Sequence, residues 1–383
     1  MKEGWTLKKL GKVCDVSAGQ GAPQGEENYC EDGIPFVKAG NVEELIHGLD
    51  ERCIQKVNEE VAKTHRLKLY KAGSVVFAKS GMSCMKGLVY TLKNDCYVVS
   101  HLAVLTPKEV KSSFLNYALN YFKPNVLVKD EAYPSISLTD ISNFTIPVPP
   151  IEIQSIIVNE LDLLQSIIDK QKAQLKELNN LAQAVFYDMF GNPVENDKEW
   201  KTDVLKTVAP QKKYDGIIPS KNGLYWLLNL DMVEQQTGRV IEKVFTKENE
   251  IGNSTITFDT SNVLYSKLRP YLNKVVVPDE IGYGTSELVP LRPNPKLLNR
   301  FFLAYLLKSK SFVDYISGKV AGAKMPRVSM DVFRGFSVIL PPLSLQQSFA
   351  TKIESIEKQK AAIDNSIEET RKLFDYTMDK YFG

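Results

Sequence analysis

Residues 149–154 read PPIEIQ, and residues 341–346 read PPLSLQ. The two stretches stand 192 residues apart, and the Phe-Gly pairs at residues 190–191 and 382–383 keep the same spacing. The segments that follow the two Pro-Pro pairs therefore align without a gap. Self-similarity at a fixed period indicates a tandem repeat, here of two copies within 383 residues.

The sequence before each Pro-Pro pair repeats more loosely. Residues 5–13 are similar to 200–208, and residues 73–80 are similar to 261–268. Each half therefore consists of a diverged globular domain followed by a better preserved long segment. We divide the chain into a first domain over residues 1–148, a segment over 149–191, a second domain over 192–340 and a segment over 341–383.

The first long segment carries the pattern of a coiled-coil helix. Residues 151–190 contain neither proline nor glycine, and Gly191 and Pro193 follow them. Apolar residues recur in alternating steps of four and three, with Gln171 in the one position that is not apolar, which is a heptad seam of about five repeats. At about 1.5 Å per residue, such a helix is roughly 60 Å long. The seam residues are Ile157, Leu161, Leu164, Ile168, Leu175, Leu178, Ala182, Val185 and Met189.

The second segment has a more broken seam of the same period. Two apolar stripes in one chain most simply bury each other. Because a whole domain separates the segments in the sequence, the second helix can return antiparallel to the first. The alternative, in which each helix packs only on its own domain, explains neither the length nor the duplication of the seam. The second seam runs through Phe349, Ile353, Ile356, Lys360, Ile363, Ile367, Thr370, Phe374, Thr377 and Tyr381.

Strand-like and helix-like runs are interspersed in both domains. In the first domain we predict strands near residues 74–77, 87–92 and 96–99 and a helix near 114–121. In the second we predict strands near residues 224–228, 263–265 and 274–277 and a helix near 300–307. The fold class is therefore α+β, with two mixed domains separated by two long helices that form an antiparallel coiled coil.

The composition is that of a globular protein, with 43% hydrophobic and 25% charged residues and a formal net charge of +2. No apolar run approaches the ~20 residues that span a bilayer. The N-terminus carries Glu3 and lacks the apolar core of a signal peptide. Five cysteines, an odd number without a C-x-x-C pair, indicate reduced thiols. We expect a cytoplasmic protein without a membrane partner.

Positive charge is concentrated locally. Residues 71–93 contain four lysines and no acid, and they surround a loop of small residues at 78–87. The second domain has a similar acid-free run at residues 266–274. Further basic clusters follow, at Lys111, Lys123 and Lys129 in the first domain and at Arg300, Lys308, Lys310, Lys319, Lys324 and Arg327 in the second.

Basic side chains on loops between strands suit contacts with DNA phosphates. Arginine also pairs bidentately with guanine, and asparagine with adenine. Any single residue here is more simply explained as an ordinary surface charge, but the recurrence in both halves favours DNA binding. The candidate DNA-binding residues are Lys38, Asn41, Lys79, Ser80, Lys86, Lys267, Arg269, Tyr271, Asn273, Lys274, Lys324 and Arg327, of which Asn41, Arg269, Asn273 and Arg327 are candidates for reading base edges.

Together these features resemble the specificity subunits of type I restriction–modification systems. The resemblance extends over nearly the whole chain and rests on the tandem halves, the Pro-Pro-x-x-x-Gln at each helix start and the run YSKLRPYLNK at residues 265–274. It implies two target-recognition domains, each reading one half of a split, asymmetric double-stranded DNA target. It also implies that the two helices act as a spacer and dock two methylation subunits, which restriction subunits carrying motor and nuclease activity then join.

Signatures of catalysis are absent from the sequence. Residues 148–151, VPPI, lack the Asn/Asp and the aromatic residue of a methyltransferase Pro-Pro loop, and no phosphate-binding GxxxxGK[ST] loop occurs. Cys84 and His101 could form a Cys–His nucleophile pair, but no third member orders it. No Cys/His set has metal-ligand spacing. We predict a non-catalytic chain without a cofactor or a metal.

Apolar residues off the helical seam are candidates for partner binding. Ile156, Leu163, Ile167 and Phe186 either contact the methylation subunits or pack against the neighbouring recognition domains. Two rival functions remain. A structural coiled-coil adaptor leaves the repeated basic loops unexplained. A nucleic-acid-binding module of another defence pathway leaves the helical surface unexplained.

Overall fold

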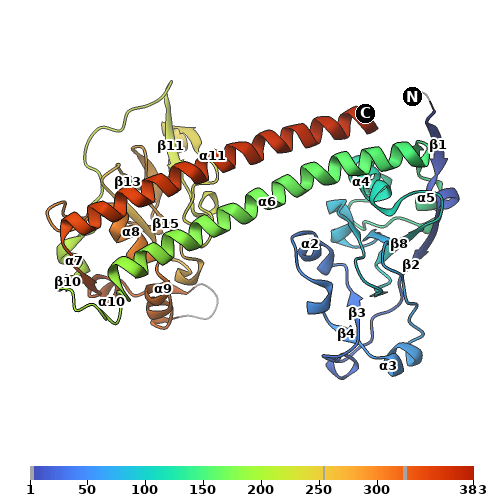
Figure 1. Ribbon diagram of the computed structural model, residues 1–383, viewed down its shortest axis with the longest axis horizontal. Coiled ribbons are helices and arrows are strands. Elements are labelled where there is room, and N and C mark those ends of the chain that lie inside the picture. The colour runs from blue at the N-terminus through green and yellow to red at the C-terminus, as the bar shows by residue number, and fades with distance from the viewer. Residues whose placement is uncertain (1–3, 253–254, 322–325) are drawn as a thin grey trace. The chain divides into compact units, whose positions relative to one another are not determined.

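The computed structural model describes residues 4–252, 255–321 and 326–383, and the chain forms two compact units. The first unit combines Met1–Lys170 with Ile367–Gly383, and the second comprises Gln171–Ser366. Each unit contains one globular domain together with parts of the long helices α6 (Ile151–Phe190) and α11 (Leu343–Phe382) (Figure 1). Both long helices were predicted from the sequence.

The first unit is built on two small sheets with strand orders β2-β8-β5-β6 and β4-β3-β7 and a separate antiparallel pair of β1 with β9. Its strands are β1 (Thr6–Lys9), β2 (Cys14–Ala18), β3 (Ile34–Val37), β4 (Lys56–Val57), β5 (Val75–Ala78), β6 (Val89–Thr91), β7 (Tyr97–Val98), β8 (Leu102–Pro107) and β9 (Thr145–Val148). Its shorter helices are α1 (Leu10–Val13), α2 (Asn41–Ile46), α3 (Glu59–Thr64), α4 (Ser112–Phe122) and α5 (Leu138–Asn143).

The second unit has two sheets with strand orders β12-β11-β16-β13 and β15-β14-β17 and the antiparallel pairs β10-β20 and β18-β19. Its strands are β10 (Thr202–Val204), β11 (Leu224–Leu228), β12 (Val244–Lys247), β13 (Thr255–Phe258), β14 (Val263–Ser266), β15 (Val275–Val276), β16 (Gly282–Thr285), β17 (Leu288–Leu291), β18 (Val320–Ala321), β19 (Arg327–Val328) and β20 (Ser337–Ile339). Its shorter helices are α7 (Leu205–Val208), α8 (Arg300–Lys308), α9 (Lys310–Ser317) and α10 (Met330–Arg334).

The two units follow one plan, which confirms the α+β fold and the tandem repeat. The pair β1-β9 corresponds to β10-β20, the buried strand β5 to β14, and helix α4 to α8. Helix α4 buries one face against the core of its unit, because its apolar residues recur at helical spacing, whereas in α8 all residues from Phe302 to Leu307 are buried. Their positions agree with the predicted helices near 114–121 and 300–307.

The long helices pair in antiparallel fashion within each unit. In the second unit, Gln171 Nε2 donates to Ser366 Oγ (2.7 Å), while the rings of Phe190 and Phe349 lie 5.3 Å apart. Residue numbers thus rise along α6 as they fall along α11. In the first unit, the hydroxyl of Tyr381 donates to the Glu160 carboxylate. Seam residues of both helices are buried in each unit, which confirms the predicted antiparallel coiled coil.

A buried glutamine explains the repeated Pro-Pro-x-x-x-Gln motif. The Nε2 of Gln154 donates to the carbonyl of the first proline of the motif (3.0 Å), and its Oε1 accepts from the backbone N–H of Lys111 (2.9 Å). Gln346 makes the equivalent bonds, at 2.8 Å to its proline and 2.9 Å from Asn299 N–H. Lys111 and Asn299 directly precede α4 and α8. Each glutamine therefore joins the start of a long helix to the start of a domain helix.

All five cysteines are free thiols, as predicted. Within the described residues, no helix has both the length and the apolar character needed to cross a membrane.

Candidate nucleic-acid interface

Three backbone hydrogen bonds hold the basic loop of the first domain, which joins β5 to β6. Lys79 N–H donates to His101 O (2.9 Å), and Ile136 N–H donates to Lys79 O (2.8 Å). Gly81 N–H donates to Pro134 O (2.9 Å). We call these three bonds the loop clamp. They fix the backbone around Lys79 between two other segments of the domain.

Beyond the clamp, the loop forms a single 3-10 turn over Met82–Lys86. The turn ends at Gly87, whose φ of 60° lies in the left-handed region. A Cβ atom at this position would stand 2.7 Å from Asn125 Oδ1, and Asn125 Nδ2 donates to Met85 O (3.1 Å). Glycine therefore lets the turn lie close against a neighbouring segment.

The loop that joins β14 to β15 in the second domain has the same clamp. Lys267 N–H donates to Glu287 O (3.1 Å), and Val328 N–H donates to Lys267 O (2.9 Å). Arg269 N–H donates to Pro326 O (2.8 Å). These bonds correspond one for one to those of the first domain, so Lys267 occupies the position of Lys79. The sequence similarity of residues 73–80 and 261–268 pointed to this equivalence.

The first-domain clamp presents Lys79 without a counter-charge. Among the residues that the structure describes, no carboxylate pairs with the Lys79 ammonium. Next to it, Ser80 Oγ and His101 Nδ1 share a hydrogen bond of 2.8 Å. Lys86, at the end of the turn, pairs with Glu43 of α2 across an exposed surface. The loop and α2 thus flank the same patch of surface, around a small cavity of about 50 Å³.

Lys38 and Asn41 lie at the start of α2, on the same patch. The Lys38 ammonium donates to Gln55 Oε1 (2.6 Å) and lies 4.5 Å from the centre of the Tyr29 ring. Asn41 Oδ1 accepts from Lys38 N–H (2.9 Å), and its Nδ2 donates to Glu44 (3.4 Å). The structure therefore brings these two candidates together with Lys86, through the Lys86–Glu43 pair.

The second-domain clamp carries more internal pairing. Lys267 Nζ donates to Ser286 O (2.8 Å), and the Arg327 guanidinium pairs with Glu287 (2.9 Å). That hydrogen bond raises the pKa of Arg327. Tyr271 is exposed at the loop surface. Lys324 lies outside the described residues.

Two candidates in this loop turn inward. Asn273 is 8% exposed, has a φ of 50° and donates through Nδ2 to Lys308 O (3.0 Å). The prediction that Asn273 offers its amide to a base edge is therefore wrong, because the side chain is packed inside the domain. Lys274 donates to Leu230 O (2.5 Å), and burial lowers its pKa. Arg269 is half-buried, with a left-handed backbone (φ 49°).

The family model described as the type I restriction modification DNA specificity domain matches twice, over residues 2–180 and 198–370. The chain belongs to this family. The two matches contain the two recognition domains in which the clamps lie.

Individual relatives agree with the family. The MjaIX specificity subunit of Methanocaldococcus jannaschii is 31% identical over 44% of this chain, and the match spans 38% of that relative. The EcoDI specificity subunit of Escherichia coli is 23% identical over 82% of this chain and 78% of the relative. The crystal structure of an S subunit from M. genitalium superposes with a TM-score of 0.59 at 12% identity, covering 100% of this chain and 98% of that one. At that identity the structural likeness concerns the fold alone.

Two exposed side chains beside the first-domain clamp of this specificity subunit were missed as candidates for DNA contact. Met82 is 71% exposed and Tyr133 is 83% exposed. They adjoin Gly81 and Pro134, which are joined by the clamp. The available signal was a large apolar residue within a loop of small residues, which a search for basic residues passes over.

Some of the candidate partner-binding residues are exposed on the long helices, and others are not. Ile156 and Leu163 are 54% and 61% exposed, and Ile167 is half-buried. Phe186 is fully buried against Phe349 and other rings of the second core, so its assignment to a docking surface is wrong. For Phe186 the alternative of packing on the recognition domain holds. Other exposed apolar side chains on the long helices are Ile151, Leu181, Leu343, Leu373 and Tyr376.

The Cys–His candidate has none of the marks of an activated nucleophile. Cys84 is 1% exposed, and burial raises the pKa of its thiol, which disfavours the reactive thiolate. The His101 ring is engaged with Ser80. Within the described ranges, no group of three or more His, Cys, Asp or Glu residues is arranged to hold a metal ion.

Proposed function

We propose that this chain reads a bipartite, asymmetric double-stranded DNA target for a type I restriction–modification complex. In this proposal residues 1–148 read one half-site and residues 192–340 the other, while residues 149–191 and 341–383 form the spacer. One observation carries the proposal: the same loop clamp holds a basic loop in both domains, while the side chains on the two loops differ. A shared backbone clamp that carries different side chains suits two domains that read different DNA half-sites.

The candidate cations divide into two roles. Lys38, Lys79, Lys86 and Lys267 carry compact charges that suit phosphate contacts, which position a protein on the duplex. Arg327 and Arg269 have the planar fork that recognises guanine, and the amide of Asn41 suits adenine. Ser80, Tyr271 and Lys274 border these groups on the clamped loops. Lys324 keeps its proposed DNA contact from the sequence alone.

The long helices are proposed to hold the two readers at a fixed separation and to recruit partners. Two-fold readers place their half-sites about one turn of DNA apart, roughly 34–36 Å, which two rods of roughly 60 Å are long enough to bridge. The exposed Ile156 and Leu163 support docking of methylation subunits, two per chain, which restriction subunits then join. Methyl transfer and cleavage are assigned to those partners, so this chain needs no cofactor of its own.

The test is selection from a random pool of duplex DNA by the full chain, alone and with its methylation subunit. The bound fraction is sequenced. The proposal predicts a split motif with a fixed gap. Salt-sensitive binding without a motif would instead indicate a general nucleic-acid binder of another defence pathway. No binding under any condition would indicate a structural adaptor. Either of these results contradicts the proposal.

A further inference from the structure

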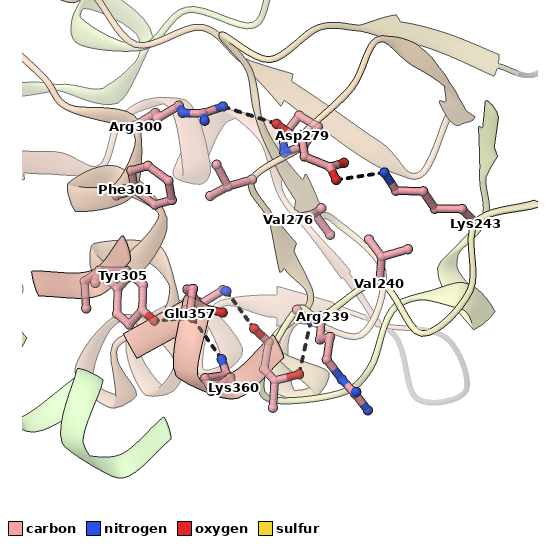
Figure 2. Close-up of a pocket in the computed structure, with 16 residues that line it drawn as sticks. Arg239, Val240, Lys243, Val276, Asp279, Arg300, Phe301, Tyr305, Glu357 and Lys360 are labelled. Carbon is pink, nitrogen blue, oxygen red and sulfur yellow. Dashed lines mark hydrogen bonds and ion pairs between the residues drawn. The ribbon is translucent and has the colours of Figure 1, made fainter. Parts of the chain in front are cut away.

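The second unit contains a cavity of about 430 Å³ that DNA reading does not explain (Figure 2). One face of α8, the loop at residues 237–240, the end of β15 and one face of α11 line it. Five cationic side chains border the cavity but only two carboxylates do. The cations are Arg239, Lys243, Arg300, Lys308 and Lys360, and the acids are Asp279 and Glu357.

Three of the five cations are neutralised within the unit. Arg239 pairs with Asp364 (2.6 Å), and Lys243 pairs with Asp279 (2.7 Å). Lys360 pairs with Glu357 (2.8 Å), which also accepts from the Tyr305 hydroxyl (3.0 Å). Figure 2 shows the Lys243 pair at one end of the cavity and the Lys360 pair at the other.

The other two cations have only carbonyl partners. Arg300 donates to the carbonyls of Thr260 and Pro278, and Lys308 donates to Thr237 O (2.6 Å). Neither forms an ion pair with a carboxylate of the described residues. Burial lowers the pKa of both, that of Lys308 to about 8. Partial burial of two cations that no carboxylate of the described residues bonds to directly is costly, and an anion in the cavity would reduce that cost.

These cations do not belong to the framework that the two units share. The equivalence of the buried glutamines and of the residues they bind aligns α8 with α4 and α11 with α6. In that alignment the tyrosine facing the long helix is retained, as Tyr117 in the first unit and Tyr305 in the second. By contrast, opposite Arg300, Lys308 and Lys360 the first unit has Ser112, Asn120 and Ile168. The charge of the cavity is therefore specific to the second unit.

The centre of the cavity is apolar and aromatic. Val240, Val276 and Phe301 lie between the two charged ends (Figure 2). The Arg300 guanidinium lies 5.0 Å from the centre of the Phe301 ring, and Lys308 Nζ lies 5.5 Å from that of Tyr305. Each unpaired cation is thus adjacent to an aromatic face. A volume of about 430 Å³ lies in the usual range for small-molecule sites.

We propose that this cavity binds a small phosphate ester with a planar organic part, whose phosphate Arg300 and Lys308 hold while the organic part lies against Phe301 and Tyr305. Arginine forms bidentate bonds with phosphate, and lysine adds a point charge. The two residues stand two turns apart on α8, about 12 Å between Cα atoms, a separation that their long side chains span from either side. The site adjoins the clamped loop of the second domain, because Asn273 Nδ2 in that loop donates to Lys308 O (3.0 Å).

The test is isothermal titration of the full chain with adenosine monophosphate, and separately with inorganic phosphate. The expected result is binding of both, with the monophosphate ester bound more tightly because of its planar part. Arg300→Met and Lys308→Met are each expected to weaken monophosphate binding by about tenfold or more. Arg300→Lys, which keeps the charge and the fold but loses the fork, is expected to give an intermediate loss.

Lys358→Met is the matched control, because Lys358 is an exposed lysine of α11 that does not line the cavity. Its monophosphate binding is expected to equal that of the unaltered chain. Thermal unfolding of every variant verifies that the unit remains folded. No binding of adenosine monophosphate, or equal binding by Arg300→Met, Lys308→Met and the control, would overturn the proposal. Loss of duplex affinity in these variants without any monophosphate binding would assign the cations to DNA and overturn it as well.

Discussion

The clamped loops after β5 and β14 are held by equivalent backbone bonds but present different charges. In the first domain Lys79 has no ion-pair partner among the described residues, and its clamp partner is His101. In the second, Lys267 is tied to Ser286 O, and the position of His101 is taken by Glu287, which pairs with Arg327. The frame is therefore set by backbone atoms, and the side chains on it are free to differ.

This division has a simple physical reason. Backbone N–H and C=O groups are present whatever the residue, so a clamp made from them survives substitution of the loop. The helix-start glutamines have no such freedom, because their side chains make the buried bonds. Two domains built in this way can diverge in what they bind while keeping the same placement on their helices.

The largest expected effect comes from lengthening the long helices while leaving both clamped loops unchanged. Insertion of seven residues into α6 between residues 165 and 180, with a matching insertion in α11, keeps the heptad seam in register. It lengthens the rods by roughly 10 Å, or about three base pairs. We expect the original target to be lost and the same two half-sites to reappear with a longer gap in methylation-site mapping. An unchanged gap would contradict a spacer role.

Removal of the helix-start glutamines tests the shared frame. Gln154→Ala and Gln346→Ala each leave a backbone N–H and a buried carbonyl unpaired, at a cost of about 2–4 kcal/mol in the free energy of unfolding. We expect Gln346→Ala to cost more, because Gln346 also donates to Leu297 O (3.0 Å). Urea denaturation measures both variants. The exposed Gln359→Ala in α11 is the control, and a loss of stability no larger than that of this control would refute the role of the glutamines in joining the helices.

The sequence alone predicts the features that side-chain spacing determines, but not those that depend on backbone conformation or tertiary packing. Side chains at heptad spacing define the coiled coil, and residues 151–190 form the predicted helix. Strand β11 and helix α8 also lie where apolar runs placed them. By contrast, the inward turn of Asn273 follows from its left-handed φ, and the burial of Phe186 from tertiary packing. Composition and spacing carry neither kind of information, so those site residues were misassigned.

Lys79 and Lys267 test the comparison between the two clamps at the level of single charges. Lys79→Ala is expected to reduce the slope of log affinity against log salt concentration by about 0.9, as expected for one lost phosphate contact. Lys267→Ala is expected to reduce it by less, because its ammonium already bonds to Ser286 O. Fluorescence anisotropy with a target duplex at several salt concentrations measures both slopes. Equal slopes for the two variants would show that the internal bond has no bearing on DNA contact.

The smallest effect concerns the acid present in only one clamp. Glu287→Gln releases Arg327 from its ion pair and removes a negative charge from the proposed DNA face. We expect affinity for duplex DNA of any sequence to rise about two- to threefold, since exposed ion pairs are weak and phosphates replace the carboxylate. The same anisotropy assay applies, with the exposed Glu248→Gln as a charge-matched control. A fall in affinity would indicate that Glu287 itself contacts the DNA.

The most direct test of the central claim, that each domain reads its own half-site, is duplex selection with one variant in each domain. Arg327→Ala lies in the second domain and Asn41→Ala in the first, and each is applied to the full chain with its methylation subunit. We predict that Arg327→Ala relaxes base preference at one position of one half-site, at a cost of about 1–3 kcal/mol, and that Asn41→Ala does the same only in the other half. Relaxation of the same half-site by both variants, or of both half-sites by either one, would contradict the account.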